Sequence, residues 1–103
     1  MPGRIDSSGD IEIICENVDK IRPHEMARLV FRVWDGCSPP YQLKITSPSG
    51  NLIVDRVIRA LPTGDPQSPP PVTFSVQAGV YEMKVRQLRG TSAGEASLRV
   101  DER

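Results

Sequence analysis

The sequence predicts an all-β protein, built as a two-sheet antiparallel sandwich of seven strands. Short stretches of alternating apolar and polar residues recur along the chain, and this period of two is typical of strands with one buried face. Glycines and prolines separate the stretches at intervals of roughly 10 residues, as in small sandwiches. No stretch has the spacing and caps of an amphipathic helix. A partly open barrel is the alternative architecture.

The expected strands, in chain order, are Ile11–Cys15, Ala27–Asp35, Tyr41–Thr46, Asn51–Ile58, Val72–Val76, Ala78–Gln87 and a last strand marked by Ala96, Leu98 and Val100. The sequence Ser47-Pro48-Ser49-Gly50 has the preferences of a type I β-turn and is expected to close a hairpin. Residues 60–71 contain five prolines, which exclude a helix or a continuous ladder there. Residues 1–9 are polar and rich in glycine and serine, so we expect a flexible N-terminus before one domain spanning residues 10–101.

The strand that begins at Gly79 has the clearest alternation. Tyr81, Met83 and Val85 are expected to point inward, while the charged residues between them point to solvent. Gly79 precedes them at a turn that requires an unusual backbone angle. A tyrosine near the start of a late strand is typical of the corner tyrosine in immunoglobulin-type sandwiches.

Three short motifs, in order, resemble the Ig-like repeats of large bacterial surface proteins and, more loosely, PKD-like domains. They are Gly36-Cys37-Ser38-Pro39-Pro40-Tyr41, then Ala78-Gly79-Val80-Tyr81 followed by Met83 and Val85, and finally Gly90 ahead of a closing strand that ends at Val100. The resemblance covers roughly residues 10–100 and implies a seven-stranded antiparallel Ig-like or fibronectin-III-like β-sandwich. It also implies a module within a larger bacterial surface protein.

Composition narrows the choice of partners. The 103 residues include 13 basic and 13 acidic side chains, so the formal charge is zero and nucleic acid is not an expected partner. No apolar run approaches the ~20 residues that a membrane-spanning helix needs. The N-terminus lacks the apolar centre of a signal peptide, which indicates a cytoplasmic protein or a module excised from an exported chain.

The residues that support catalysis or metal binding are sparse. His24 is the one histidine, and the sequence has no Gly-x-Ser-x-Gly elbow and no phosphate-binding glycine loop. We therefore expect no catalytic residues, no metal site, no cofactor and no enzyme activity. Cys15 and Cys37 are expected at opposite ends of the domain, roughly 30 Å apart, so no disulfide is expected because a bridge needs Cα atoms within ~7 Å.

Two outward faces are candidate binding surfaces. The first carries Ile14, Arg28, Val30, Arg32 and Trp34, and it combines a tryptophan with arginines, as interface hot spots do. The alternative is that Trp34 turns into the core.

The second face carries Lys44, Lys84, Arg86 and Arg99, and Glu82 and Glu95 partly neutralise its positive charge. It is expected to suit an acidic partner or, alternatively, to serve only as a charged, soluble surface.

These observations favour a non-catalytic Ig-like module for protein–protein interaction or structural linkage, with a protein or a neighbouring domain as partner. A free-standing cytoplasmic subunit of a larger assembly and a carbohydrate-binding β-sandwich are the alternatives.

Overall fold

The structure, a computed structural model, describes residues 3–33, 39–59 and 71–102. The strands are β1 (Gly3–Gly9), β2 (Glu12–Cys15), β3 (Met26–Arg32), β4 (Tyr41–Thr46), β5 (Leu52–Ile58), β6 (Val72–Ser75), β7 (Gly79–Gln87) and β8 (Ala93–Val100). One 3₁₀ turn, η1 (Val18–Lys20), lies between β2 and β3. The prediction of an all-β chain is confirmed for these residues.

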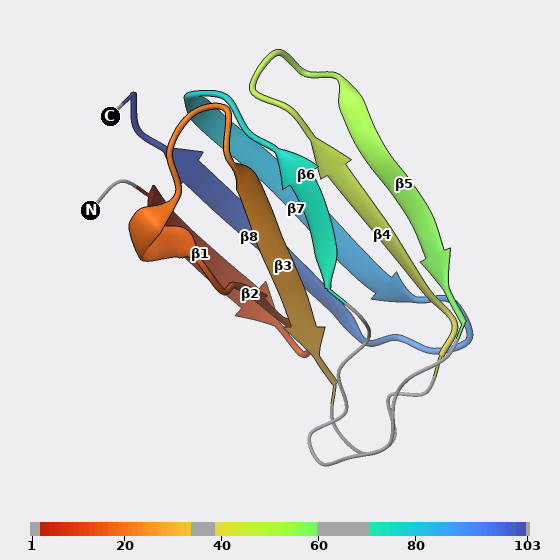
Figure 1. The fold of residues 1–103 in the computed structure, drawn as a ribbon. Helices are drawn as coiled ribbons and strands as arrows, with labels where there is room; N and C mark the ends of the chain where they lie inside the picture. Colours follow the sequence, from red (N-terminus) through yellow and green to blue (C-terminus); the bar gives the residue numbers. More distant parts are fainter. Residues whose placement is uncertain (1–2, 34–38, 60–70, 103) are drawn as a thin grey trace.

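The strands form two antiparallel sheets that face each other (Figure 1). The larger sheet has the order β1-β8-β7-β4-β5, and the smaller has the order β2-β3-β6. The predicted two-sheet sandwich is confirmed, but the predicted number of seven strands is wrong, because the described residues form eight.

The additional strand is β1, which lies within residues 1–9, the predicted flexible N-terminus. Gly3–Gly9 instead pair antiparallel with β8, from Gly3 opposite Val100 to Gly9 opposite Gly94. The polar side chains of β1 gave no alternation to detect, because the strand is an edge strand held mainly by its backbone ladder. The chain then passes from the larger to the smaller sheet at Gly9, which has a φ of +101°.

The core lies between the sheets and is built from the alternating residues that the sequence analysis expected to point inward. It includes Ile13 and Cys15 of β2, Leu29 and Phe31 of β3, Leu43 and Ile45 of β4, Phe74 of β6, Tyr81, Met83 and Val85 of β7, and Ala96, Leu98 and Val100 of β8. Phe31 contacts Tyr41 edge to face across the two sheets, with ring centroids 5.9 Å apart. These contacts join β3 of the smaller sheet to β4 of the larger one.

Strand β3 differs in extent from the predicted strand Ala27–Asp35, since it ends at Arg32. Trp34, Cys37 and the proline-rich residues 60–70 lie outside the described residues. The predicted turn at Ser47–Gly50 is present, with the Gly50 N–H donating to the Ser47 carbonyl at 2.9 Å.

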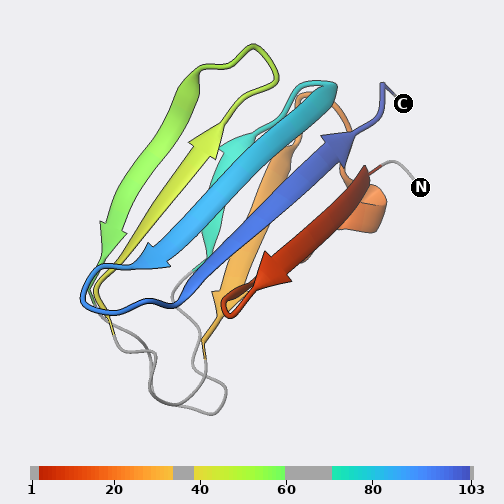
Figure 2. The ribbon, with the colours of Figure 1, turned by 180° about the vertical axis from the view of Figure 1, so that it is seen from behind.

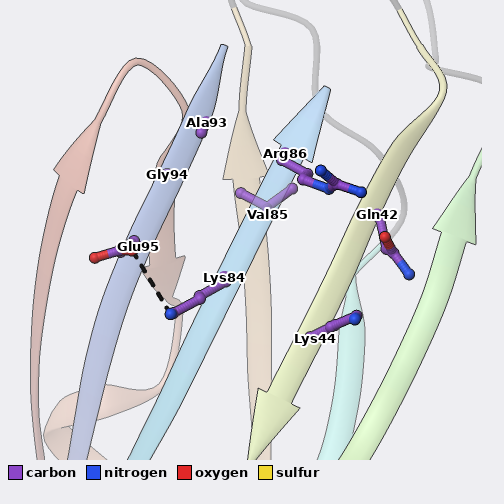
Figure 3. Close-up of a pocket in the computed structure, with 8 residues that line it drawn as sticks. All are labelled: Gln42, Lys44, Lys84, Val85, Arg86, Ala93, Gly94 and Glu95. Carbon is purple, nitrogen blue, oxygen red and sulfur yellow. Dashed lines mark ion pairs between the residues drawn. The ribbon is translucent and has the colours of Figure 1, made fainter. Parts of the chain in front are cut away.

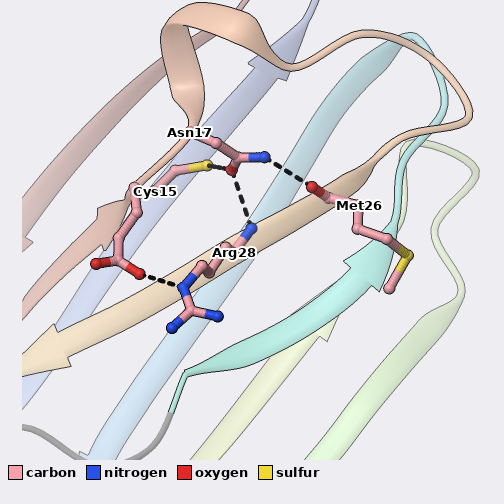
Figure 4. Close-up of polar contacts among 5 residues, drawn as sticks. Cys15, Asn17, Met26 and Arg28 are labelled. Carbon is pink, nitrogen blue, oxygen red and sulfur yellow. Dashed lines mark hydrogen bonds and ion pairs between the residues drawn. The ribbon is translucent and has the colours of Figure 1, made fainter.

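The Asn17 side chain fastens the end of β2 to the start of β3 (Figure 4). Its Nδ2 donates to the Met26 carbonyl at 2.8 Å, and its Oδ1 accepts from the Arg28 N–H at 3.1 Å. The Cys15 thiol also donates to this Oδ1, at 3.4 Å. The amide therefore continues the ladder where the backbone of β2 turns away.

Tyr81 fixes the corner between β6 and β7. Its ring is buried against Phe74, with centroids 5.4 Å apart, and its hydroxyl accepts a hydrogen bond from the Gln77 N–H at 2.8 Å. Gly79, between the two, has a φ of +132°, which confirms the unusual backbone angle predicted there. A Cβ at this position would lie 2.7 Å from the Pro48 ring.

Tyr81→Phe should lower the free energy of unfolding by about 1–3 kcal/mol, because the Gln77 N–H loses its acceptor at a partly buried site. Urea unfolding measures the loss, and hydrogen exchange of the Gln77 amide should accelerate at the same time. An unchanged exchange rate at Gln77 would show that the hydroxyl does not hold this corner.

Candidate functional site

The most distinctive cluster of charged side chains lies on the outer face of the larger sheet. Lys44 of β4 and Lys84 and Arg86 of β7 point to solvent between inward-facing core residues. The prediction that these strands share a sheet with the last strand is confirmed, because β4, β7 and β8 are adjacent.

A hollow of about 300 Å³ opens among these cations (Figure 3). Its lining is Gln42, Lys44, Lys84, Val85, Arg86, Ala93, Gly94 and Glu95. Ala93 lies opposite Arg86, and Gly94 lies opposite Val85. Because Ala93 offers only a methyl group opposite Arg86, the longer side chains of β4 and β7, with Glu95 of β8, surround an unfilled stretch of the sheet.

The charges around the hollow are unbalanced. Lys44 and Lys84 lie directly opposite each other on β4 and β7, an arrangement of like charges that costs a sheet roughly 0.2–1 kcal/mol. Lys84 has a loose ion pair with Glu95, at 3.9 Å. Asp55 lies opposite Lys44 in β5 but accepts a hydrogen bond from Gln42 at 3.1 Å. Within the described part of the chain, neither Lys44 nor Arg86 forms an ion pair.

The structure does not bring Arg99, the fourth residue of the predicted basic face, to the hollow. It lies near the other end of β8, opposite Val80, and pairs with Asp101 at 3.4 Å. The basic site therefore consists of Lys44, Lys84 and Arg86, which we call the basic hollow.

The other predicted surface, on the smaller sheet, is largely neutral. Ile14 and Val30 lie opposite each other on its outer face and are half-buried. Arg28 pairs with Glu16 at 2.6 Å, and Arg32 lies 3.8 Å from Glu12. These cross-strand partners satisfy the arginine charges that suggested a binding surface. Trp34, the aromatic member of this predicted set, is outside the described residues.

Other reactive groups do not gather into a second site. Burial raises the pKa of the Cys15 thiol, so the neutral thiol is its form near neutral pH. His24 occupies a turn with a φ of 73°, and its Nδ1 lies 3.4 Å from Gln77 Nε2. Over residues 3–33, 39–59 and 71–102, no three His, Cys, Asp or Glu side chains are placed to hold a metal ion. No helix in the same ranges is long and apolar enough to cross a membrane.

Comparisons of the sequence give no relative from which a function could be transferred: no family model matches, and neither a curated protein nor a solved structure is significantly similar. The class of protein that the fold defines is an all-β, two-sheet sandwich.

The three cations were predictable from the sequence, whereas the hollow was not. The hollow depends on register, which sets Lys44 against Lys84 and places the small residues Ala93 and Gly94 beside Arg86. The one local signal was the small residue Ala93 at the start of the last strand. It indicates a hollow only once the β7–β8 register places it opposite Arg86.

Proposed function

We propose that the chain is a non-catalytic Ig-like module that binds a protein partner. The strand order supports the Ig-like assignment. The order β2-β3-β6 corresponds to strands A-B-E of an immunoglobulin-type sandwich, and β4-β7-β8 corresponds to C-F-G. Strand β5, beside β4, then takes the place of the extra strand C′ in variable-type domains. The Tyr81 hydroxyl, bonded to the backbone four residues upstream, matches the tyrosine corner.

We further propose that the basic hollow receives an acidic segment of the partner. The observation that carries this proposal is the placement of Lys44 directly opposite Lys84, with Arg86 beside them. Each lysine also has a carboxylate opposite it on its other side, Asp55 for Lys44 and Glu95 for Lys84. Only the Lys84–Glu95 pair comes within ion-pair distance, and Arg86 has no carboxylate opposite it on β4 or β8. Carboxylates of a bound partner would offset the repulsion and supply the acceptors that Lys44 and Arg86 lack.

The carbohydrate-binding alternative has no support among the described residues, because Phe31, Tyr41, Phe74 and Tyr81 are all buried in the core. Sugar-binding faces present exposed aromatic rings. The other alternative, a subunit of a larger assembly, is compatible with the same basic hollow. It differs from the proposed module only in that the complex with the partner is permanent.

The test uses fluorescently labelled hexaglutamate as the acidic probe and fluorescence anisotropy at low salt. The double variant Lys44→Gln/Arg86→Gln should bind at least about tenfold more weakly than the wild type, the equivalent of ~1.4 kcal/mol. Lys44→Gln alone should leave the free energy of unfolding within about 0.5 kcal/mol of the wild type, because it removes both the repulsion from Lys84 and the attraction to Asp55.

Arg99→Gln is the matched control, since Arg99 is an exposed cation on the same face but away from the hollow. Its loss should change hexaglutamate affinity less than twofold. If the control and the double variant lose the same hexaglutamate affinity, the probe binds through the overall charge of the protein, and the proposed site is refuted.

A further inference from the structure

Strand β5 is strongly apolar yet has no buried residue. Five of its seven residues are apolar: Leu52, Ile53, Val54, Val57 and Ile58. Leu52 is 52% exposed, Ile53 43% and Val57 39%, while Val54 and Ile58 are only half-buried. Every other strand of the sandwich core, β2 to β4 and β6 to β8, buries its alternate residues.

The exposure of β5 follows from the unequal sizes of the sheets. The larger sheet has five strands and the smaller has three, and β5 is the edge strand of the larger one. Both views show β5 at the margin of the sandwich, beyond the strands of the smaller sheet (Figures 1 and 2). Val54 and Ile58 therefore pack only partly against the core, and the outer edge of β5 lacks a neighbouring strand among the described residues.

The other edges are protected in familiar ways. The opposite edge of the larger sheet, β1, is polar and carries the Arg4–Asp6 ion pair, at 3.0 Å. The edges of the smaller sheet, β2 and β6, have only four residues each. Short edges and charged edges resist pairing with other chains, whereas a long apolar edge invites it.

We propose that β5 binds an extended segment of another protein by strand addition, the mode in which a peptide becomes a further strand at a sheet edge. The segment has apolar residues opposite Val54 and Ile58 and an acidic residue opposite Arg56. Arg56 is exposed and, within the described residues, has no ion pair. A carboxylate directly across the new ladder complements its charge.

Register arithmetic argues against a second copy of the chain as the occupant. A register shift between Leu52 and Val54 leaves Val54–Ile58 as the regular part of β5, centred on Arg56. In a closed twofold dimer both copies keep their inner faces on the same side of the joined sheet, because directly opposed residues share a face. Antiparallel pairing over this whole stretch then places Arg56 opposite Arg56. Two shifted registers are shorter. A pair centred on Asp55 keeps only Val54–Arg56 paired and places the two Asp55 side chains opposite each other. A pair centred on Val57 keeps only Arg56–Ile58 paired. Like charges directly opposed destabilise the full pairing.

This surface differs from the basic hollow, so the inference does not depend on the proposed function. The probe is a labelled peptide containing Val-Thr-Glu-Lys-Val, which in antiparallel register sets its glutamate opposite Arg56 and its lysine opposite Asp55. A second peptide, Val-Thr-Arg-Glu-Val, reverses both charges. Anisotropy measures the affinity of each for the whole chain.

The wild type should prefer the first peptide by about tenfold or more, and Arg56→Glu/Asp55→Lys should reverse the preference. Because both residues are exposed, circular dichroism should show an unchanged fold. Lys84→Gln in the basic hollow should leave the preference intact, which separates this surface from the proposed acidic-segment site.

Three results would overturn the inference. They are absence of binding at millimolar peptide, equal affinity for both peptides, and a preference that Arg56→Glu/Asp55→Lys fails to reverse. A concentration-dependent dimer in sedimentation that Val57→Lys abolishes would assign the edge to a second copy instead.

Discussion

Replacing Gly94 by valine is expected to abolish stable folding, with a loss of more than about 4 kcal/mol of unfolding free energy. A Cβ at this position would overlap the Ile11 carbonyl oxygen. The obstacle is backbone and not a side chain that can rotate, and the Ile11 N–H donates to the Ala93 carbonyl at 3.2 Å. The chain crosses between the sheets next to this contact, so a shift there disturbs both sheets. Total stabilities of small domains are only about 5–15 kcal/mol, which makes the loss decisive.

Gly50→Ala is the matched control for this experiment. Gly50 has a φ of +89°, but a Cβ placed there would have no neighbouring atom within 4 Å, so the substitution costs only backbone strain of about 1–2 kcal/mol. Urea unfolding of both variants should rank Gly94→Val far below Gly50→Ala in stability. The reverse ranking would mean that β8 does not approach Ile11 as closely as the structure shows.

Phe31→Ala is expected to cost about 3–5 kcal/mol of unfolding free energy, because it opens a cavity between the sheets. Phe31 is 3% exposed, and its ring meets Tyr41 at an interplanar angle of 78°. The loss includes the transfer free energy of the ring, the residual cavity and the edge-to-face contact. Thermal or urea unfolding measures it.

Phe31→Leu separates the contributions, since it keeps an apolar side chain and should cost about 1.5 kcal/mol or less. Val80→Ala, at a 42% exposed position of β7, should stay within about 0.5 kcal/mol of the wild type. A Phe31→Ala loss no larger than that of Val80→Ala would contradict a core in which β3 packs on β4.

Alternation made the core strands predictable from the sequence. Leu29 and Phe31, Leu43 and Ile45, and the residues around Tyr81 lie on strands that each have one buried and one wet face, and that period is a local property of the chain. The turn at Gly79 was predictable for a similar reason, because a glycine before an alternating strand has a specific backbone use.

Features that depend on register or on layer size were not predictable locally. Strand β1 is polar and was assigned to a flexible end, since nothing in Gly3–Gly9 indicates the β8 ladder that pairs with it. The opposition of Lys44 and Lys84 follows from the β4–β7 register. The apolar sequence of β5 is typical of an ordinary core strand. The strand is exposed because, among the described residues, the smaller sheet has no strand that faces it.

The most direct test of the proposed protein-binding role is an NMR titration of isotope-labelled protein with hexaglutamate, because one series of spectra reports on all three candidate surfaces. We expect shift changes to concentrate at Lys44, Lys84, Arg86 and the neighbouring Gly94, and to weaken as salt is raised. The outer face around Ile14 and Val30 should remain unperturbed, and so should β5 apart from Asp55, which lies opposite Lys44. Changes centred on either of those surfaces, or spread evenly over all exposed cations, would contradict the assignment of the basic hollow as the binding site.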